Sequence, residues 1–558
     1  MKNRCDGGTN LGSHTESGWY FAKDLVTSTH GMVAAKHPLA ARAGLSILRQ
    51  GGNAVDAAVA TAFVVGVVEP WASGLGGGGV LLISSRNTAP VAIDYGVRAP
   101  AGAQPDMFAL DQGYDRETSW WPSVRDEANI HGPLAVAVPG APAGLATALA
   151  EFGTMSLADV LRPAIVLARD GFPIHWTTAL QISMDALTLG RYPAAAGIFL
   201  PGDAPPPIST IAAPQLLRQP ELARTLELIA SEGADAFYRG PVADRIVESL
   251  QRGGGILTLD DLAQYHPVSE PAHLCHMPEY SVAVAPGPHA GITLAEIFEI
   301  FAALREESCG HNTTDYLHFL IEATHAALTD RFTLLGDGAG RARLASAGRV
   351  ANHRTRIVHG RAAPWNIRGF DPASTTHLCV IDSDGTAVSL TQTLLSWFGS
   401  RVLAPGTGVV LNNGMMWFNP VPGHPNSVGP GRRPLSNMTP VVVLSQDQPV
   451  FAVGASGGRR IVNAVLQVVL NAVEFSMDAQ SAIAAPRIDA SDAQVVVDVR
   501  IPQEIHMALR RRGHEIVAGE EQVWPRPFAS PVAIARDLNT GALTGGADPF
   551  HPAIAAGY

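Results

Sequence analysis

The pattern of apolar residues changes near residue 375, and this change constrains the fold more than any other feature of the sequence. Before it, long segments such as residues 54–68, 157–170 and 313–334 carry apolar side chains at helical spacing. After it, short apolar runs such as residues 377–382 are separated by turn signals, as in β-strands. The sequence therefore predicts a helix-rich part followed by a strand-rich part, with both helices and sheets in the fold.

A run of glycines at residues 74–79 matches the G-x-G-x-x-G pattern of dinucleotide-binding loops. In such loops the glycines follow a strand and open a helix, so that phosphate meets the helix N-terminus. Here the run follows the predicted helix at 54–68 and opens a predicted strand at 80–83. We therefore exclude nucleotide binding and expect the glycines to allow close packing of two backbone segments.

Composition narrows the class of protein further. Of the 558 residues, 46% are hydrophobic and 16% charged, which is enough to bury a sizeable core. The formal net charge of −11, with scattered lysines and arginines, excludes a nucleic-acid partner. Four cysteines are too few for a disulfide framework and fit a reducing compartment. With no apolar signal region and no run of membrane-spanning length, we expect a cytoplasmic protein without a membrane partner.

Several segments, taken in order, resemble the γ-glutamyltranspeptidase family. They lie at residues 31–40, 51–58, 73–78, 138–144, 153–172, 260–265, 327–337 and 544–549, and so cover nearly the whole chain. The resemblance implies an α+β fold, the four-layer αββα sandwich of N-terminal-nucleophile hydrolases. It also implies one precursor that cuts itself into a large and a small subunit.

In that family the cut precedes the first threonine of a Thr-Thr-His motif, which stands here at Thr375. The implied parts are a polar leader at 1–30, a large subunit at 31–374 and a small subunit at 375–558, together forming one composite domain. A threonine hydroxyl is a poor nucleophile until a base takes its proton. The α-amine of a chain-terminal threonine can do so, because its pKa is near 8. Cleavage and catalysis are therefore linked.

The resemblance assigns three further residues to catalysis. Thr393 matches the family threonine whose hydroxyl bonds the nucleophile, and Gly457 with Gly458 matches the glycine pair of the oxyanion hole. Consecutive glycines let backbone N–H groups reach a ligand without a Cβ in the way. Amine-assisted acyl transfer requires no cofactor, and the histidines have no metal-ligand spacing. We therefore expect neither a metal nor an organic cofactor.

The sequence departs from γ-glutamyl enzymes where they bind the glutamate head group. Their carboxylate-binding arginine is replaced by Gly96, and we expect Arg98, two residues on, to substitute for it. An asparagine becomes Leu395, and an acidic residue becomes Trp417. The other residues expected to line the substrate site are Asn413, Ser436, Asn437 and Arg460, the last beside Arg459. A free γ-glutamyl substrate is disfavoured, because its charged groups would lack partners.

Three interpretations follow. The first is a hydrolase of a small carboxylate amide or a comparable carbonyl compound, similar to oxamate amidohydrolases or to relatives that cleave an oxalyl C–C bond. The second is a diverged γ-glutamyl hydrolase or transpeptidase, or a cephalosporin-type acylase. The third is a non-catalytic relative that keeps the fold for binding or assembly, against which the intact Thr375 and Thr393 argue.

Overall fold

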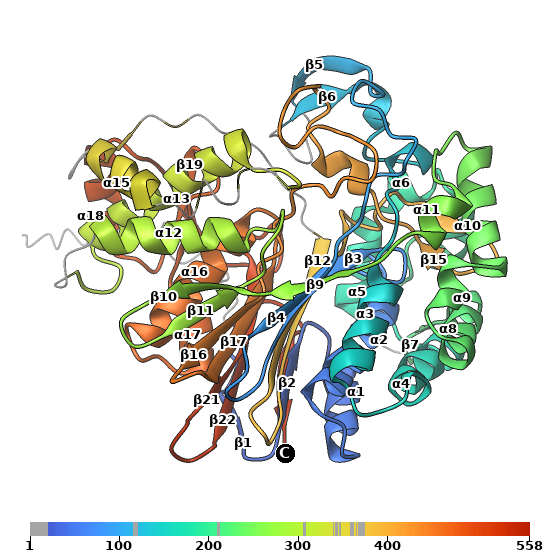
Figure 1. The fold of residues 1–558 in the computed structure, drawn as a ribbon, viewed down its shortest axis with the longest axis horizontal. Coiled ribbons are helices and arrows are strands. Elements are labelled where there is room, and N and C mark those ends of the chain that lie inside the picture. The colour runs from blue at the N-terminus through green and yellow to red at the C-terminus, as the bar shows by residue number, and fades with distance from the viewer. Residues whose placement is uncertain are drawn as a thin grey trace, which may run out of the picture.

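Two seven-stranded sheets lie face to face at the centre of the molecule, with helices on both outer sides (Figure 1). The computed structural model describes residues 21–114, 121–208, 213–304, 309–338, 340, 344, 347–357, 362–363, 365 and 374–558. Among these residues, no helix is both long and apolar enough to cross a membrane.

The strands of both sheets come from before and after residue 374. The first sheet has the order β1 (Val26–Ser28), β22 (Leu543–Ala547), β21 (Ser530–Arg536), β17 (Gln448–Ser456), β16 (Val441–Ser445), β11 (Ser281–Val284) and β10 (His273–His276). The second has the order β23 (Ile554–Gly557), β2 (Met32–Ala35), β12 (Ser374–Ile381), β13 (Ala387–Leu395), β3 (Gly78–Ser84), β4 (Val91–Tyr95) and β9 (Val268–Pro271). All neighbours within each sheet are antiparallel. The two parts predicted from the sequence therefore fold as one unit.

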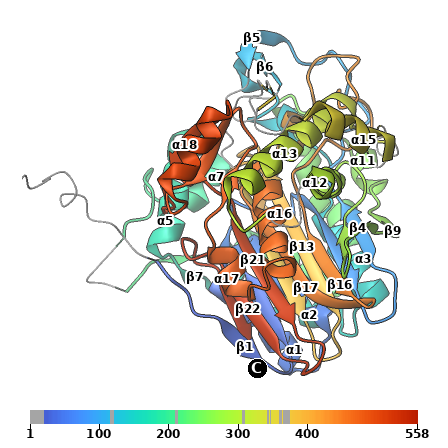
Figure 2. The same ribbon diagram turned by 90° about the vertical axis from the view of Figure 1, so that its left-hand side faces the viewer.

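Each side of each sheet contributes to an apolar layer. Small and branched side chains, such as Ala34, Val80 and Val442, fill the space between the sheets. On the second sheet pack α1 (Pro38–Arg49), α2 (Ala54–Val68) and α3 (Ala141–Phe152), with α4 (Leu157–Asp170) and α8 (Pro220–Glu232) behind them. On the first sheet pack α12 (Gly291–Leu304), α16 (Arg460–Val473) and α17 (Ala479–Ala484), with α13 (Thr314–Leu334) beside α12 (Figure 2). The predicted four-layer αββα sandwich is confirmed.

The remaining elements are shorter and lie around these layers. They are β5 (Leu110–Tyr114), β6 (Pro122–Val124), η2 (Arg125–Glu127), η3 (Pro133–Ala135), β7 (Phe172–Pro173), α5 (Trp176–Met184), α6 (Ala186–Leu189), α7 (Pro193–Phe199), β8 (Leu216–Leu217), α9 (Asp235–Tyr238), α10 (Pro241–Arg252), α11 (Leu259–Ala263), α15 (Ala347–Arg356), β14 (Leu403–Ala404), β15 (Val409–Val410), η4 (Gly414–Trp417), β18 (Ile488–Asp489), β19 (Gln494–Asp498), α18 (Gln503–Arg511) and β20 (Glu515–Gly519).

Local sequence signals set the element boundaries as expected. Asn53 caps α2: its side chain accepts from the backbone N–H groups of Val55 and Asp56, and the Asp56 carboxylate accepts from the Asn53 N–H. One boundary differs from the prediction. Residues 1–20 of the predicted leader lie outside the described residues, but Val26–Ser28 forms the edge strand β1 against β22, so the sheet includes part of that segment.

Candidate active site

Thr375 lies at an irregularity in the pairing of two central strands. Ser374 in β12 pairs with Leu395 in β13, whereas Thr376 pairs with Gln392, so the register shifts at Thr375. Bulges of this kind redirect a side chain out of the regular alternation. The Thr375 side chain is 7% exposed, and its Oγ1 donates a hydrogen bond of 3.2 Å to Thr393 Oγ1.

The Thr393 hydroxyl connects the nucleophile to the carbonyl on its N-terminal side. It donates to the backbone carbonyl oxygen of Ser374 at 2.6 Å, and it accepts from Thr375 and from the Leu395 N–H at 2.8 Å. Leu395 adopts a φ of 85°, a left-handed backbone conformation that is strained for a residue other than glycine. The arrangement therefore polarises the Ser374 carbonyl beside the Thr375 hydroxyl.

Gly457 and Gly458 form the junction between β17 and the N-terminus of α16. Their φ angles are 143° and 58°, and a Cβ at Gly457 would lie 2.6 Å from Ala529 Cβ. Only glycine fits the first of these positions. Backbone N–H groups at the start of a helix carry partial positive charge, so this junction suits a developing oxyanion.

Thr375 and Gly457 open into the same cavity, here called the outer cavity, which holds about 910 Å³ of space, part of it open to solvent. Two tryptophans form one wall: the Trp397 and Trp524 rings lie 5.1 Å apart, and the Trp397 indole N–H donates to Gln181 Oε1 at 2.8 Å. Ser374 also lines this cavity. An apolar group on the leaving side of a substrate would therefore meet aromatic surface.

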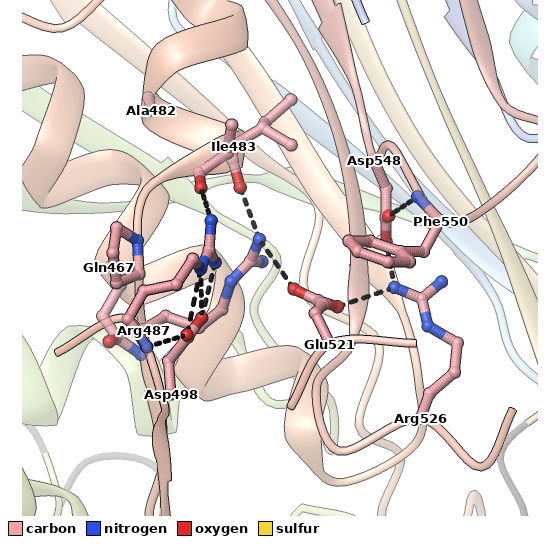
Figure 3. Close-up of polar contacts among 12 residues, drawn as sticks. Gln467, Ala482, Ile483, Arg487, Asp498, Glu521, Arg526, Asp548 and Phe550 are labelled. Carbon is pink, nitrogen blue, oxygen red and sulfur yellow. Dashed lines mark hydrogen bonds and ion pairs between the residues drawn. The ribbon is translucent and has the colours of Figure 1, made fainter. Parts of the chain in front are cut away.

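The lining of the outer cavity also includes charged side chains. Arg460 and Arg526 both line it, and Arg526 is held between Glu521 and Asp548 (Figure 3). Glu69 lines the same cavity and accepts from Thr376 Oγ1 at 3.2 Å, and burial raises the pKa of its carboxyl. The outer cavity thus contains two arginines together with Glu69, whose carboxyl keeps its proton to a higher pH than an exposed glutamate does.

A second, smaller space, here called the inner cavity, lies on the other side of Thr393. The empty space in it is about 280 Å³, part of it open to solvent, and its lining consists of Gly78, Gly96, Val97, His289, Thr393, Leu395, Arg433, Pro434, Ser436 and Met438. The inner cavity therefore brings together three residues from the comparison with γ-glutamyl enzymes. Gly96 and Leu395 are departures from those enzymes, and Ser436 is a match. His289 and Arg433 join them, although no sequence signal had singled out either residue.

A family model described as Gamma-glutamyltranspeptidase matches residues 40–558. The chain belongs to this family. It is 35% identical over 535 residues to the "Acylase ACY 1 proenzyme" of Pseudomonas sp. (strain V22), covering 94% of this chain and 93% of that protein. It is 34% identical over 484 residues to the "Glutathione hydrolase proenzyme" of Escherichia coli (strain K12), covering 83% and 81%. The crystal structure of cephalosporin acylase from Bacillus halodurans matches with a TM-score of 0.86, 30% identity and 98% coverage of both chains.

As a γ-glutamyltranspeptidase family member, the chain is an enzyme of the N-terminal-nucleophile hydrolase class. The resemblance inferred from the sequence motifs is confirmed. Of the residues that the motifs assign, Thr375 and Thr393 are in contact, Gly457 and Arg460 share the outer cavity with Thr375, and Ser436 lines the inner cavity.

Four of the six residues expected to bind substrate lie outside the lining of both cavities, as does Gly458 of the expected oxyanion pair. The Arg98 guanidinium lies 5.5 Å from the centre of the Tyr265 ring and donates to the His266 carbonyl at 3.1 Å, and it does not line either cavity. Asn413 donates to Ser396 Oγ, Trp417 packs in an apolar cluster, and Asn437 is buried, all outside the lining of both cavities. Substrate binding by these four residues stays a prediction.

The fold also brings together side chains of the types that bind metal ions, although they lie far apart in the sequence. They form two buried groups among the described residues, His318 with Glu322 and His514, and Glu296 with Asp330 and His353. In the first group, His318 Nδ1 lies 2.7 Å from His514 Nε2, the distance of an imidazole hydrogen bond and shorter than the ~3.3 Å between two ligands on tetrahedral zinc. In the second, Asp330 is already paired with Arg349. Neither group lines the cavities beside Thr375.

Proposed function

We propose that the chain is a precursor that cuts itself between Ser374 and Thr375, and that the mature enzyme hydrolyses the amide of a short, carboxylate-bearing acyl group through a threonyl acyl-enzyme. The observation that carries the proposal is the hydrogen-bonded path from Thr375 Oγ1 through Thr393 Oγ1 to the Ser374 carbonyl oxygen. It joins a nucleophile, a donor and the carbonyl to be attacked.

In processing, Thr375 Oγ1 bonds to the Ser374 carbonyl carbon while Thr393 donates to the carbonyl oxygen. The C–N bond then breaks and the nitrogen takes up a proton, which leaves Ser374 joined to Thr375 by an ester. Water hydrolyses this ester, giving a carboxylate on Ser374 and a free α-amine on Thr375. The base required for turnover thus exists only after the cut.

In turnover, the Thr375 α-amine accepts the Oγ1 proton as Oγ1 attacks the substrate carbonyl. The N–H groups of Gly457 and Gly458 stabilise the oxyanion. Electrostatic stabilisation of this kind usually makes the largest contribution to the rate enhancement of acyl transfer. The leaving amine takes the proton and departs through the outer cavity. Water then hydrolyses the acyl-enzyme, releasing the acid and restoring Thr375.

The small inner cavity supports a short acyl group, of the oxamate or oxalyl type, as the first candidate. Gly96 and Leu395 line it, and the sequence resemblance matches them to an arginine and an asparagine of γ-glutamyl enzymes, so a glutamate head group would leave its charges unpaired. A cephalosporin-type acylase is the second candidate. It is favoured by the acylase relatives and by the Trp397–Trp524 wall, which suits a larger apolar leaving group.

The test begins with the purified chain. Denaturing electrophoresis should show two fragments, residues 1–374 and 375–558, and N-terminal sequencing should read Thr375 first. Thr375→Ala should leave an uncut, inactive precursor, whereas Thr375→Ser should cut more slowly. A single band with full activity, or wild-type activity in Thr375→Ala, would exclude the mechanism. Oxamate, a γ-glutamyl anilide and a glutaryl amide, assayed side by side, decide between the substrate candidates.

A further inference from the structure

Phe550 stands between the outer cavity and a neighbouring space, here called the side cavity. The side cavity contains about 1060 Å³ of empty space, part of it open to solvent, and its lining includes Phe21, Lys23, Val499 and Glu521. Among the described residues, Phe550 lines both the outer and the side cavity, and no other residue does. Its ring therefore lies where the two spaces meet.

Phe550 belongs to the connection between β22 and β23, residues 548–553. Three consecutive residues of this connection, 550–552, line the outer cavity. At its start, Asp548 pairs with Arg526, and the Asp548 carboxylate accepts a hydrogen bond of 2.8 Å from the Phe550 N–H (Figure 3). The connection is thus tied on one side to an arginine that itself lines the outer cavity.

Lys23 ties the same connection from the N-terminal segment. Its ammonium group donates to the carbonyl oxygens of Asp548 at 2.7 Å and His551 at 2.6 Å, and to that of Ala553. Burial lowers the pKa of Lys23 from its usual 10.5 to about 8, so the group is still charged at pH 7 and has one N–H for each carbonyl. One side chain therefore holds the connection from its first residue to its last.

The N-terminal segment also supports the Phe550 ring itself. The Phe21 and Phe550 rings lie 5.2 Å apart at an angle of 59°, which is a favourable aromatic contact. Phe21 and Lys23 both precede β1, within the part of the chain that the sequence predicted as a polar leader. This part of the chain therefore holds a wall of the cavity into which Thr375 opens.

We propose that Phe550 sets the upper size limit of the leaving amine by separating the outer cavity from the side cavity, and that Lys23 and Phe21 hold its ring in this position. The inference rests on the proposed amide hydrolase function, in which the leaving amine occupies the outer cavity. Phe550 is the specificity-determining residue, and the other two are positioning residues that act through it. An amine longer by one rigid group has to displace a ring that is supported from both sides.

The central experiment compares two amides that differ only in the length of the leaving amine. The acyl group is oxalyl, succinyl or glutaryl, whichever the wild-type enzyme hydrolyses fastest, and the amines are benzylamine and 4-phenylbenzylamine. Their methylene group insulates the reacting nitrogen from the added ring, so intrinsic reactivity is matched. The wild-type enzyme should prefer the shorter amide by roughly tenfold or more in kcat/KM at pH 7, as for a group that a pocket does not accommodate.

Phe550→Ala should remove most of this preference by raising kcat/KM for the longer amide. Such a gain of activity cannot come from a damaged fold. Val523→Ala is the matched control, because Val523 lines the outer cavity but not the side cavity. It widens the outer cavity without joining the two spaces, so it should change the preference far less. An equal change in both variants, or an unchanged preference in Phe550→Ala, would overturn the assignment of Phe550.

A coupling test separates positioning of the ring from general stabilisation. Lys23→Met keeps the length of the side chain but removes its three donors, and it should shift the preference in the same direction as Phe550→Ala by a smaller factor. In the Phe550→Ala background it should cause no further shift, because Lys23 acts only through the ring. The exposed Asp24→Asn should cause none. An undiminished effect of Lys23→Met in the double variant, or no effect in the wild-type background, would contradict the role of Lys23.

A binding measurement keeps the two proposals distinguishable. Calorimetric titration with benzylamine and with 4-phenylbenzylamine measures affinity for the leaving amine without hydrolysis, and Phe550→Ala should gain affinity for the longer amine relative to the shorter one. If no amide is hydrolysed but this gain occurs, the hydrolase proposal is wrong and the role of Phe550 stands. If the amides are hydrolysed but neither rates nor affinities respond to Phe550→Ala, only the role of Phe550 is wrong. Absence of both hydrolysis and the gain in affinity would contradict both proposals.

Discussion

Thr393 is placed to act twice, once on the chain itself and once on the substrate. In the uncut chain its hydroxyl donates to the Ser374 carbonyl while it accepts from Thr375. After the proposed cleavage, the same hydroxyl would still lie beside Thr375 Oγ1, and its proton would be free to form a hydrogen bond with the substrate. A single side chain can therefore assist both the formation and the use of the active site.

Removing this hydroxyl should slow both reactions. We expect Thr393→Ala to reduce the processing rate and kcat by roughly ten- to a thousandfold, the scale for loss of one preorganised donor. Thr393→Ser should recover most of the rate because it keeps the hydroxyl, whereas Thr393→Val, with a similar shape, should not. Time courses of fragment formation and initial rates measure the two effects, and an unchanged rate at saturating substrate in Thr393→Ala would reject the role.

The sequence identified some of these residues and missed others for a physical reason. Thr375, Thr393 and Gly457 stand in short motifs whose chemistry depends on adjacent residues, so the motifs reveal them. The replacement of an arginine by Gly96 was also visible, but Arg98 was expected to compensate because it is near in sequence. His289 lies beside Gly96 but comes from the segment that leads into α12, so only the folded structure brings the two residues together.

At the scale of elements, the junction between β17 and α16 holds the two glycines of the proposed oxyanion site. The strand ends at Ser456 and the helix begins at Arg460, so Gly457 and Gly458 must turn the chain within a few residues. The sequence motif matched these residues to the glycine pair of the family's oxyanion hole, and the structure adds the reason for the first glycine. Its φ of 143° and its contact with Ala529 leave no room for a side chain.

Gly457→Ala should therefore abolish activity and slow processing, because the backbone must shift to relieve the contact with Ala529. A loss of about a hundredfold or more is expected when an oxyanion donor moves. Gly541→Ala is the control, since Gly541 has a φ of 73° but no atom within 4 Å of its would-be Cβ. It measures the cost of the left-handed backbone alone, about 1–2 kcal/mol, and should leave kcat unchanged. Equal kcat values for the two variants would contradict the assignment.

Helix α13 carries a buried acid that should make stability depend on pH. Burial raises the pKa of Glu322 from its usual 4.5 to about 7. Between these values the folded chain binds more protons than the unfolded chain, so this contribution to stability is present at low pH and is lost as pH rises through 7. Glu322→Gln should therefore gain in melting temperature relative to wild type from pH 5 to pH 8. The exposed Glu232→Gln should show no such trend, and a constant difference for Glu322→Gln would contradict the argument.

At the scale of the whole molecule, the proposed cut before Thr375 would separate segments that are interleaved in both sheets. In the second sheet, the neighbouring strands β12 and β13 lie between β2 and β3, which both come from the chain before residue 374. The first sheet likewise joins β11 to β16. The change of pattern near residue 375 was visible in the sequence, but the strand order shows that it is not a boundary between domains, because strands from both sides share both sheets. The interpretation of this position as a cleavage site comes from the family resemblance and stays a proposal.

Because Thr375 lies at the start of β12, a cut before it would also change the kinetic order of refolding. In the uncut chain, β2 meets β12 by closing a loop, which is a first-order event. Once the bond before Thr375 is broken, the same pairing becomes an association of two molecules. Urea-unfolded Thr375→Ala precursor should refold at a rate independent of protein concentration, whereas the cut enzyme should recover activity faster as concentration rises. Concentration-independent recovery of the cut enzyme would contradict this. The lifetime of a cut molecule at low concentration would then be set by its rate of unfolding and not by an equilibrium.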